Sequence, residues 1–184
     1  DVHAFEPDPD AREAAASLNL AEVRAGALPG PTAFDERFDL VCALDVIEHV
    51  DADEASCAAL AQRLKPDGFA LFTVPAFMFL WSGHDEVLHH KRRYRRPAFD
   101  AMLERAGLEI AYSSYFNTLL FPAALAGRTV QRLTGSASSE DTSSLPPAFA
   151  NAALGAVFAA ERHLLPAMKL PFGVSVLSLA RLKR

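Results

Sequence analysis

The chain has 184 residues, of which 51% are hydrophobic and 22% are charged, and its formal net charge is -5. This length suits a single domain, and the apolar content excludes an intrinsically disordered chain. The acidic balance argues against a general attraction for nucleic acid, so we expect no nucleic-acid partner. No run reaches the roughly 18–20 apolar residues of a membrane span.

The chain contains two cysteines, Cys42 and Cys57. Neither has the spacing of a metal ligand, and both lie in apolar surroundings, so we expect small buried hydrophobic residues. So few cysteines in a chain of this size also favour a reducing compartment. Because the sequence opens with no signal-peptide pattern, we expect a cytoplasmic protein.

The first part of the chain alternates strand and helix patterns. Residues 2–5 predict a short strand, and residues 11–20 predict a helix behind an acidic cap. Residues 21–30 contain a weak strand and a Gly/Pro turn. The apolar density of residues 38–46 predicts a buried strand.

The alternation continues in the next part. Residues 53–64 predict a helix with acids in its first turn, and residues 69–76 predict another buried strand. Residues 97–106 begin with Pro and are followed by Gly107, as expected of a helix and its end. Residues 108–116 then predict a strand. Regular alternation of this kind predicts an α/β sheet with helices on both faces.

Two apolar helical patterns between residues 117 and 172 fall outside this alternation. A Ser-rich segment at 135–147 separates them, and its composition predicts a mobile linker. A closing strand with a basic tail follows at 173–184. We therefore expect an α/β core, residues 1–116 and 173–184, with a helical lid insertion at 117–172.

Three stretches in a fixed order resemble a known family. They are "FDLVCALDVIEHV" (38–50), "LAQRLKPDGFALFTVP" (60–75) and "LERAGLEI" (103–110). Their order resembles class I S-adenosylmethionine-dependent methyltransferases of the small-molecule type. That order is a strand, the motif D-x-x-E-H, a helix, the motif L-K-P-x-G and a strand ending in Pro. The resemblance implies a Rossmann-like, doubly wound, mostly parallel sheet closed by an antiparallel hairpin, with S-adenosyl-L-methionine as cofactor. The family's glycine-rich loop is not among these residues, so we expect the chain to be N-terminally incomplete.

Ligands of an open parallel sheet bind beyond the carboxyl ends of its strands, where Glu6 and Asp45 follow two predicted strands. A carboxylate at such a position can accept hydrogen bonds from both ribose hydroxyls, although Glu6 could also be a solvated acid before a helix. The resemblance assigns Glu6 to the ribose. It also places cofactor contacts at Pro7, Ala27, Leu28, Asp45 and Val46.

Glu48 and His49 lie one turn beyond Asp45, where a substrate would bind. His49 could act as a general base, since the ordinary pKa of histidine is about 6.5, and His90 is a second candidate. The alternative is structural, with Glu48 capping the next loop and His49 packed. Asp45, Glu48, His49 and His90 are similar to the magnesium ligands of small-RNA 2′-O-methyltransferases. Because two histidines are unusual magnesium ligands, we assign no metal.

Residues 77–96 are irregular and include "WSGHDEVLHHKRRYRR" (81–96), which combines histidines, aromatics and five cations. Arginine forks suit the oxygens of an anionic substrate, but the run could equally neutralise nearby acids. The candidates for substrate binding are Glu48, Trp81, His84, His89, Arg92, Arg93 and Tyr94.

Together these patterns predict a methyltransferase acting on a small or lipid-linked metabolite, anionic if the basic run contacts it. The apolar lid could hold a lipid, touch a membrane surface, form a homodimer or be plain core. A non-catalytic methyltransferase-like binding module is an alternative. A dinucleotide-dependent oxidoreductase is a weaker one, because no Tyr/Lys pair follows Asp45.

Overall fold

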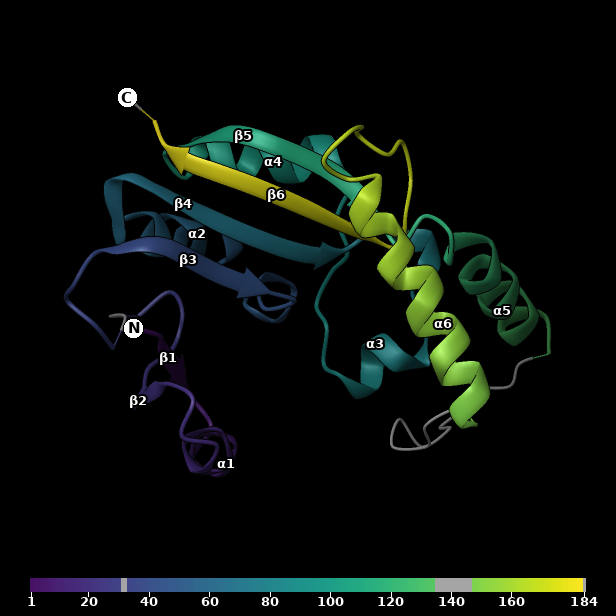
Figure 1. Ribbon diagram of the computed structural model, residues 1–184, viewed down its shortest axis with the longest axis horizontal. Coiled ribbons are helices and arrows are strands. Elements are labelled where there is room, and N and C mark those ends of the chain that lie inside the picture. The colour runs from purple at the N-terminus through teal and green to yellow at the C-terminus, as the bar shows by residue number, and fades with distance from the viewer. Residues whose placement is uncertain (31–32, 135–146, 184) are drawn as a thin grey trace.

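The computed structural model describes residues 1–30, 33–134 and 147–183, and it contains two sheets (Figure 1). The smaller sheet pairs two parallel strands on either side of helix α1 (Pro9–Ser17): β1 (His3–Glu6) and β2 (Glu22–Ala25). The larger sheet has the order β3-β4-β6-β5. Its strands are β3 (Phe38–Leu44), β4 (Leu64–Pro75), β5 (Leu108–Phe116) and β6 (Ser175–Leu182).

Strand directions in the larger sheet agree with the predicted closure. Strands β3 and β4 are parallel, whereas β6 runs antiparallel to both of its neighbours, β4 and β5. The mixed α/β architecture expected from the sequence is therefore confirmed. Strand β4 begins at Leu64, earlier than predicted, because "KPDG" extends the strand instead of only ending the preceding helix.

Five further α-helices and three single turns of 3-10 helix connect or flank the strands of the described residues. The α-helices are α2 (Asp53–Ala61), α3 (Gly83–Val87), α4 (Arg96–Arg105), α5 (Phe121–Thr134) and α6 (Ala148–Ala160). Single turns of 3-10 helix are η1 (Ile47–His49), η2 (Met78–Leu80) and η3 (Glu161–His163).

Helix ends follow the local chemistry of the sequence. The Asp8 carboxylate accepts hydrogen bonds from the backbone N–H groups of Asp10 and Ala11 and so caps α1. Helix α4 has Pro97 in its first turn and Gly107 just beyond its end, where φ is +90°. Only glycine adopts that conformation without strain, which explains why the helix stops there.

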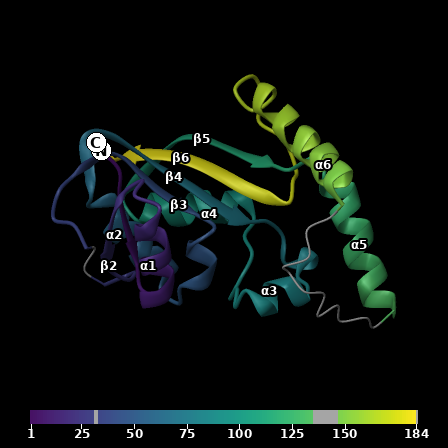
Figure 2. The ribbon, with the colours of Figure 1, turned by 60° about the horizontal axis from the view of Figure 1, so that its bottom comes forward.

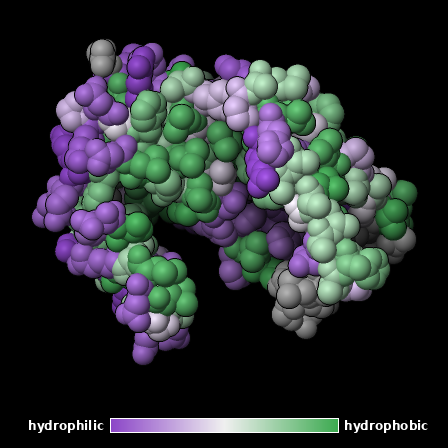
Figure 3. Space-filling view, viewed as in Figure 1, coloured by the Kyte–Doolittle hydropathy of each residue, from purple (hydrophilic) through white to green (hydrophobic). Residues whose placement is uncertain are grey.

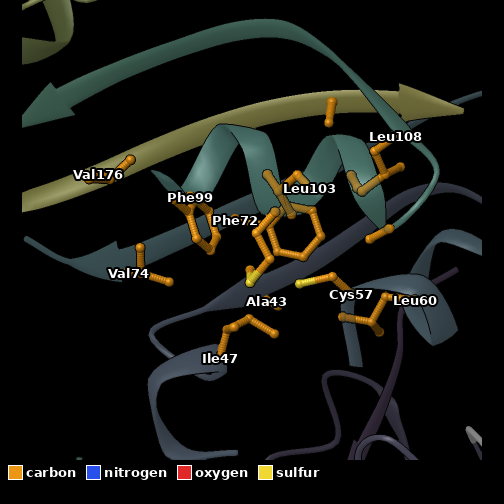
Figure 4. Packing of buried hydrophobic residues seen from close by; sticks show 14 of the residues in the cluster. Ala43, Ile47, Cys57, Leu60, Phe72, Val74, Phe99, Leu103, Leu108 and Val176 are labelled. Carbon is orange, nitrogen blue, oxygen red and sulfur yellow. The ribbon is translucent and has the colours of Figure 1, made fainter. Parts of the chain in front are cut away.

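Helices α2 and α4 cover one face of the larger sheet and enclose the core. Alternate residues of β4 point toward them, and Ala70, Phe72 and Val74 are fully buried. The rings of Phe72 and Phe99 meet edge to face, with centroids 6.2 Å apart (Figure 4). The core therefore lies on the helical side of the sheet.

The opposite face of the larger sheet is apolar and largely open among the described residues. Leu40 and Leu44 of β3 are 54% and 52% exposed, and Phe69 of β4 is 37% exposed. This face is the green area over the strands in Figure 3. The expectation of a fully buried β3 was wrong. Cys57 is buried as expected, but Cys42 lies on the open face and is exposed.

Helices α5 and α6 lie beyond the end of the sheet toward which β3 and β4 point (Figures 1 and 2). Their anchor is polar, because the Leu119 N–H donates to Glu161 Oε1 at 2.6 Å and the Tyr112 hydroxyl donates to the Leu165 carbonyl. The predicted linker, except for Pro147, lies outside the described residues. No helix in the described ranges is long and apolar enough to cross a bilayer.

Candidate active site

The carboxyl end of β3 is the structural origin of the site. Asp45 follows the strand with φ of +52°, a left-handed conformation that is uncommon for a residue with a side chain. Its N–H donates to the Thr73 backbone carbonyl and hydroxyl, each at 3.0 Å, which fixes the turn. The chain then enters η1, which carries Glu48 and His49 away from the strand.

Glu48 is fully buried, and neither carboxylate oxygen has a hydrogen-bond partner among the described residues. Burial raises the pKa of Glu48 to about 7, and the negative charges of Asp45 and Asp85 act in the same direction. A buried acid with no donor is rare, because its desolvation is uncompensated. This residue is therefore a candidate for function.

His90 comes back to Glu48 from the irregular stretch. The Lys91 N–H donates to the Glu48 carbonyl at 2.9 Å, and His90 Nε2 lies 4.0 Å from Glu48 Oε1. The rings of His49 and His90 meet edge to face, with centroids 4.6 Å apart. Burial lowers the pKa of His49, and the neighbouring His90 lowers it further. The structure thus brings together the three side chains that the sequence singled out.

Asp85 is a site residue that the sequence reasoning missed. His90 Nδ1 lies 2.9 Å from Asp85 Oδ1, and Arg93 donates to both Asp85 oxygens, from Nε at 2.7 Å and from Nη2 at 3.1 Å. Burial would raise the pKa of Asp85, but Arg93 outweighs it and lowers that pKa. An ionised carboxylate only accepts, so Nδ1 of His90 carries the proton. The pattern S-x-x-D, a capping box from Ser82 to Asp85, was the available signal.

The basic run is mostly paired within the protein. Arg93 is 4% exposed and also donates to the Ala76 carbonyl, while Arg92 pairs with Asp53 at 2.8 Å. Tyr94 is buried, and its hydroxyl donates to Asp53 at 2.9 Å. Arg93 and Tyr94, predicted to contact substrate, therefore make internal contacts instead. The described contacts favour the alternative that this run neutralises nearby acids.

Three further predicted substrate residues lie at or close to the protein surface. His84 and His89 are exposed, and Trp81 is half-buried. Burial lowers the pKa of His84, and the charge of Arg128 from α5 adds to this effect. Burial lowers the pKa of Arg128, and the charge of Arg93 lowers it further, whereas the charge of Asp85 acts in the opposite direction.

An aromatic group joins the lid to the same region. The rings of Phe77 and Phe79 stack at 5.0 Å, and Phe121 of α5 meets Phe77 with centroids 6.1 Å apart. Phe121 also contacts Phe172 at 5.3 Å, and Phe77 stacks on Tyr115 of β5. Strand ends and lid are thus packed by aromatic side chains next to the polar cluster.

Residues predicted to hold the cofactor follow the ends of three strands. Glu6 ends β1, and its Oε1 accepts from the Asp8 N–H at 3.0 Å, an interaction that occupies one of its two oxygens. Ala27 and Leu28 follow β2, and Leu28 packs against the core. Asp45 and Val46, both exposed, follow β3. Carboxylates at two strand ends suit the hydroxyl and ammonium groups of S-adenosylmethionine, so this donor set fits the cofactor.

The two acids belong to different sheets, and no contact between them is described. A hollow of about 500 Å³ lies between Pro29–Gly30 and the α2 surface, and its lining contains none of the predicted site residues. The polar cluster of Glu48, His49 and His90 is therefore the best-defined site of this part of the chain.

Comparison with known proteins decides the family. A family model described as "Methyltransferase domain" matches residues 1–113, more than half of the chain. The chain belongs to the methyltransferase family. This result confirms the predicted class and weighs against the oxidoreductase alternative. No curated protein sequence matches this methyltransferase significantly.

Solved structures support the same fold at low sequence identity. A possible histamine N-methyltransferase from Thermotoga maritima has a TM-score of 0.59 and 16% identity, over 99% of this chain and 73% of that one. A putative methyltransferase from Bacillus halodurans gives 0.58 and 19%, over 98% and 82%. A TehB-like S-adenosylmethionine-dependent methyltransferase from Corynebacterium glutamicum gives 0.56 and 16%, over 100% and 68%.

Proposed function

We propose that this methyltransferase methylates a hydroxyl group of a small, lipid-linked metabolite, with S-adenosylmethionine as methyl donor. The observation that carries the proposal is the group formed by the buried Glu48 and the half-buried His49 and His90 beyond the Asp45 strand end. A hydroxyl acceptor must lose its proton when it is methylated, and a basic side chain at this position can take that proton.

The cofactor supplies a methyl group on a positively charged sulfur, which is already a good donor. Glu6 would accept hydrogen bonds from its ribose, and Asp45 with Val46 would border its methionine end. Asp45 adds negative potential where the sulfonium charge would lie. The protein's main contribution would then be alignment of the acceptor and exclusion of water.

His90 is the better oriented of the two candidate bases. Its Nδ1–H is held by Asp85, so Nε2 is the nitrogen that can take a proton from the acceptor. Nε2 faces Glu48, and the ring of His49 lies beside it. Asp85 is a positioning residue in this arrangement, since it acts on the acceptor only through His90.

The lid supports a lipid-linked acceptor. Helix α6 has no charged residue and no buried residue in its 13 positions. Phe149 and Phe158 on it are 79% and 51% exposed. Apolar surface of this extent marks a site for a lipid or a protein partner. Its position beyond the carboxyl ends of β3 and β4 would bring a lipid chain beside the polar cluster (Figure 2).

Transfer of radiolabelled methyl groups from S-adenosylmethionine to a lipid extract tests this function. We expect label in the organic phase, and we expect His90→Gln to lower kcat by about 10²–10⁴-fold. His163→Gln, a change at an exposed histidine away from the cluster, is the matched control and should leave the rate unchanged.

Three outcomes, one from isothermal titration and two from the transfer experiment, would contradict parts of the proposal. Isothermal titration without heat for S-adenosylmethionine or its demethylated product would reject the cofactor. Binding without transfer to any fraction would favour the non-catalytic binding module. Label found only in water-soluble products would reject the lipid-linked acceptor while leaving methyl transfer intact.

A further inference from the structure

Three potential ligand groups converge in the buried cluster. One atom each from Glu48, His49 and His90 can be chosen so that all three lie within 4.8 Å of one another. Glu48 is fully buried, and both of its oxygens lack a hydrogen-bond donor in the described part of the chain. An unpartnered buried carboxylate facing two imidazoles is an arrangement that a bound cation would satisfy.

The His90 imidazole is also held from behind. Its Nδ1 lies 2.9 Å from Asp85 Oδ1, and Asp85 also accepts from Arg93 and from the Ser82 N–H. This ring therefore has one nitrogen engaged outside the cluster, while Nε2 lies toward Glu48. Metal-binding histidines in proteins show this outer support, which fixes the ring and the protonated nitrogen.

We propose that Glu48, His49 and His90 bind a divalent transition-metal ion of the zinc or cobalt type. Two imidazole nitrogens and one carboxylate oxygen suit these ions, whereas magnesium prefers a shell of oxygens. Metal–nitrogen bonds are about 2.0–2.1 Å long. Ligand atoms within 4.8 Å of one another reach that geometry by small side-chain movements.

A bound ion would change how an acceptor is activated. Coordination lowers the pKa of a bound hydroxyl, so the acceptor would lose its proton to water, and this route would replace the base role that the proposed function gives to His90. This consequence rests on the proposed function. The metal site itself does not, because binding can be measured without cofactor or acceptor.

Titration of the metal-free protein with Co²⁺ tests the site, since a nitrogen-ligated cobalt ion absorbs visible light. We expect absorption bands for the wild type and at least tenfold weaker binding for Glu48→Gln and His90→Gln. His163→Gln should match the wild type, which excludes binding by a surface histidine. Zn²⁺ should raise the thermal midpoint of the wild type and His163→Gln, but not of the two ligand variants. Circular dichroism checks that each variant is folded.

The proposal fails if Co²⁺ gives no bands, if the ligand variants bind as tightly as the wild type, or if excess Mg²⁺ displaces the ion. Methyl transfer that proceeds at full rate in such a protein would leave the imidazole base of the proposed function in place. Conversely, Co²⁺ bands that depend on Glu48 and His90, without any methyl transfer, would reject the proposed function and keep the metal site.

Discussion

Arg93 organises the irregular stretch between β4 and α4 at the level of single residues. Its guanidinium donates to Asp85 and to the Ala76 carbonyl, its backbone N–H donates to the Met78 sulfur, and its side chain is nearly fully buried. By holding Asp85, it holds His90 against Glu48. A residue that reads as a surface cation in the sequence is thus an internal support of the site.

Replacing Arg93 should destabilise the fold. Arg93→Ala leaves the buried Asp85 carboxylate without the guanidinium, its permanently charged partner, and breaking a buried pair in this way costs about 3–5 kcal/mol. Urea unfolding followed by circular dichroism measures the loss. Lys91→Ala is the control from the same run, because Lys91 pairs with Asp51 at the surface. Equal unfolding midpoints for the two variants would show that Arg93 contributes no buried pair.

Asp53 should make stability depend on acid. Burial would raise the pKa of Asp53, but hydrogen bonds from Tyr94 and Arg92 outweigh it and hold the pKa below its usual value of 3.8. An acid whose pKa is lower in the folded state stabilises the fold above its unfolded pKa and loses this contribution as pH falls through the folded pKa.

The gap in unfolding free energy between the wild type and Asp53→Asn should therefore be largest near neutral pH and should shrink below about pH 4. Urea unfolding at a series of pH values measures the gap. A gap that stays constant from pH 7 to pH 3 would contradict the role given to this carboxylate.

The sequence predicted the residues at the centre of the site but not Asp85, which holds His90 in place. Glu48 and His49 follow an apolar strand, so their place at the sheet end could be predicted from local pattern. His90 was singled out as a candidate base and by its resemblance to a metal-ligand position, and the structure brings it to them. Asp85 lies in the same stretch, but its role depends on how the loop folds back, which spacing does not reveal.

Helix α6 is the least usual element of the fold. It has no charged side chain and no buried one, and two cations, Arg162 and Lys169, follow it in the sequence. Nearby Glu161, the acid at its end, is buried in its contact with Leu119. Apolar side chains beside cations favour an anionic lipid surface over a neutral one.

The lid should bring the protein to anionic vesicles. We expect the wild type to co-sediment with vesicles that contain phosphatidylserine, and Phe149→Asp/Phe158→Asp to stay in the supernatant, because charges oppose insertion of the apolar face. Asn151→Asp is the control, since it adds a negative charge to α6 without removing an aromatic ring. A wild type that remains wholly in the supernatant would contradict this prediction. If that protein were a dimer in solution, a second copy of the chain would be favoured as the partner of this apolar surface.

The end of α6 shows a limit of pattern-based boundaries. Apolar residues recur as far as Leu165, but α6 ends at Ala160 and a 3-10 turn follows. Glu161 turns inward there to accept from the Leu119 N–H. A tertiary contact with the start of the lid thus ends the helix, and such a contact leaves no local signal.

The whole molecule has one covered and one open face of its larger sheet. The order of strands and helices was readable because strand and helix periods alternate along the chain. The exposure of the second face of the larger sheet could not be predicted in this way, because a run in which almost every residue is apolar is typical of a strand buried on both faces. Leu40 and Leu44 belong to such a run and are nevertheless half exposed.

The two cysteines report on that open face. Cys42 lies on it and is exposed, whereas Cys57 is in the core, where burial raises the pKa of its thiol to about 12. We expect one thiol to react quickly with Ellman's reagent in the native protein and two in urea. Cys42→Ser should abolish the fast reaction and Cys57→Ser should retain it. A native protein without a reactive thiol would mean that this face is covered by another segment or a second copy.

The last strand in the sequence occupies an interior place in the sheet. Strand β6 pairs with β4 and β5 along its length, and the lid separates it in sequence from β5. A chain that stops before Ser175 would leave β5 unpaired and separated from the β3–β4 pair. Synthesis on the ribosome must therefore deliver nearly all of these residues before the core can close, and a nascent chain paused at the lid would be a target for chaperones and proteases.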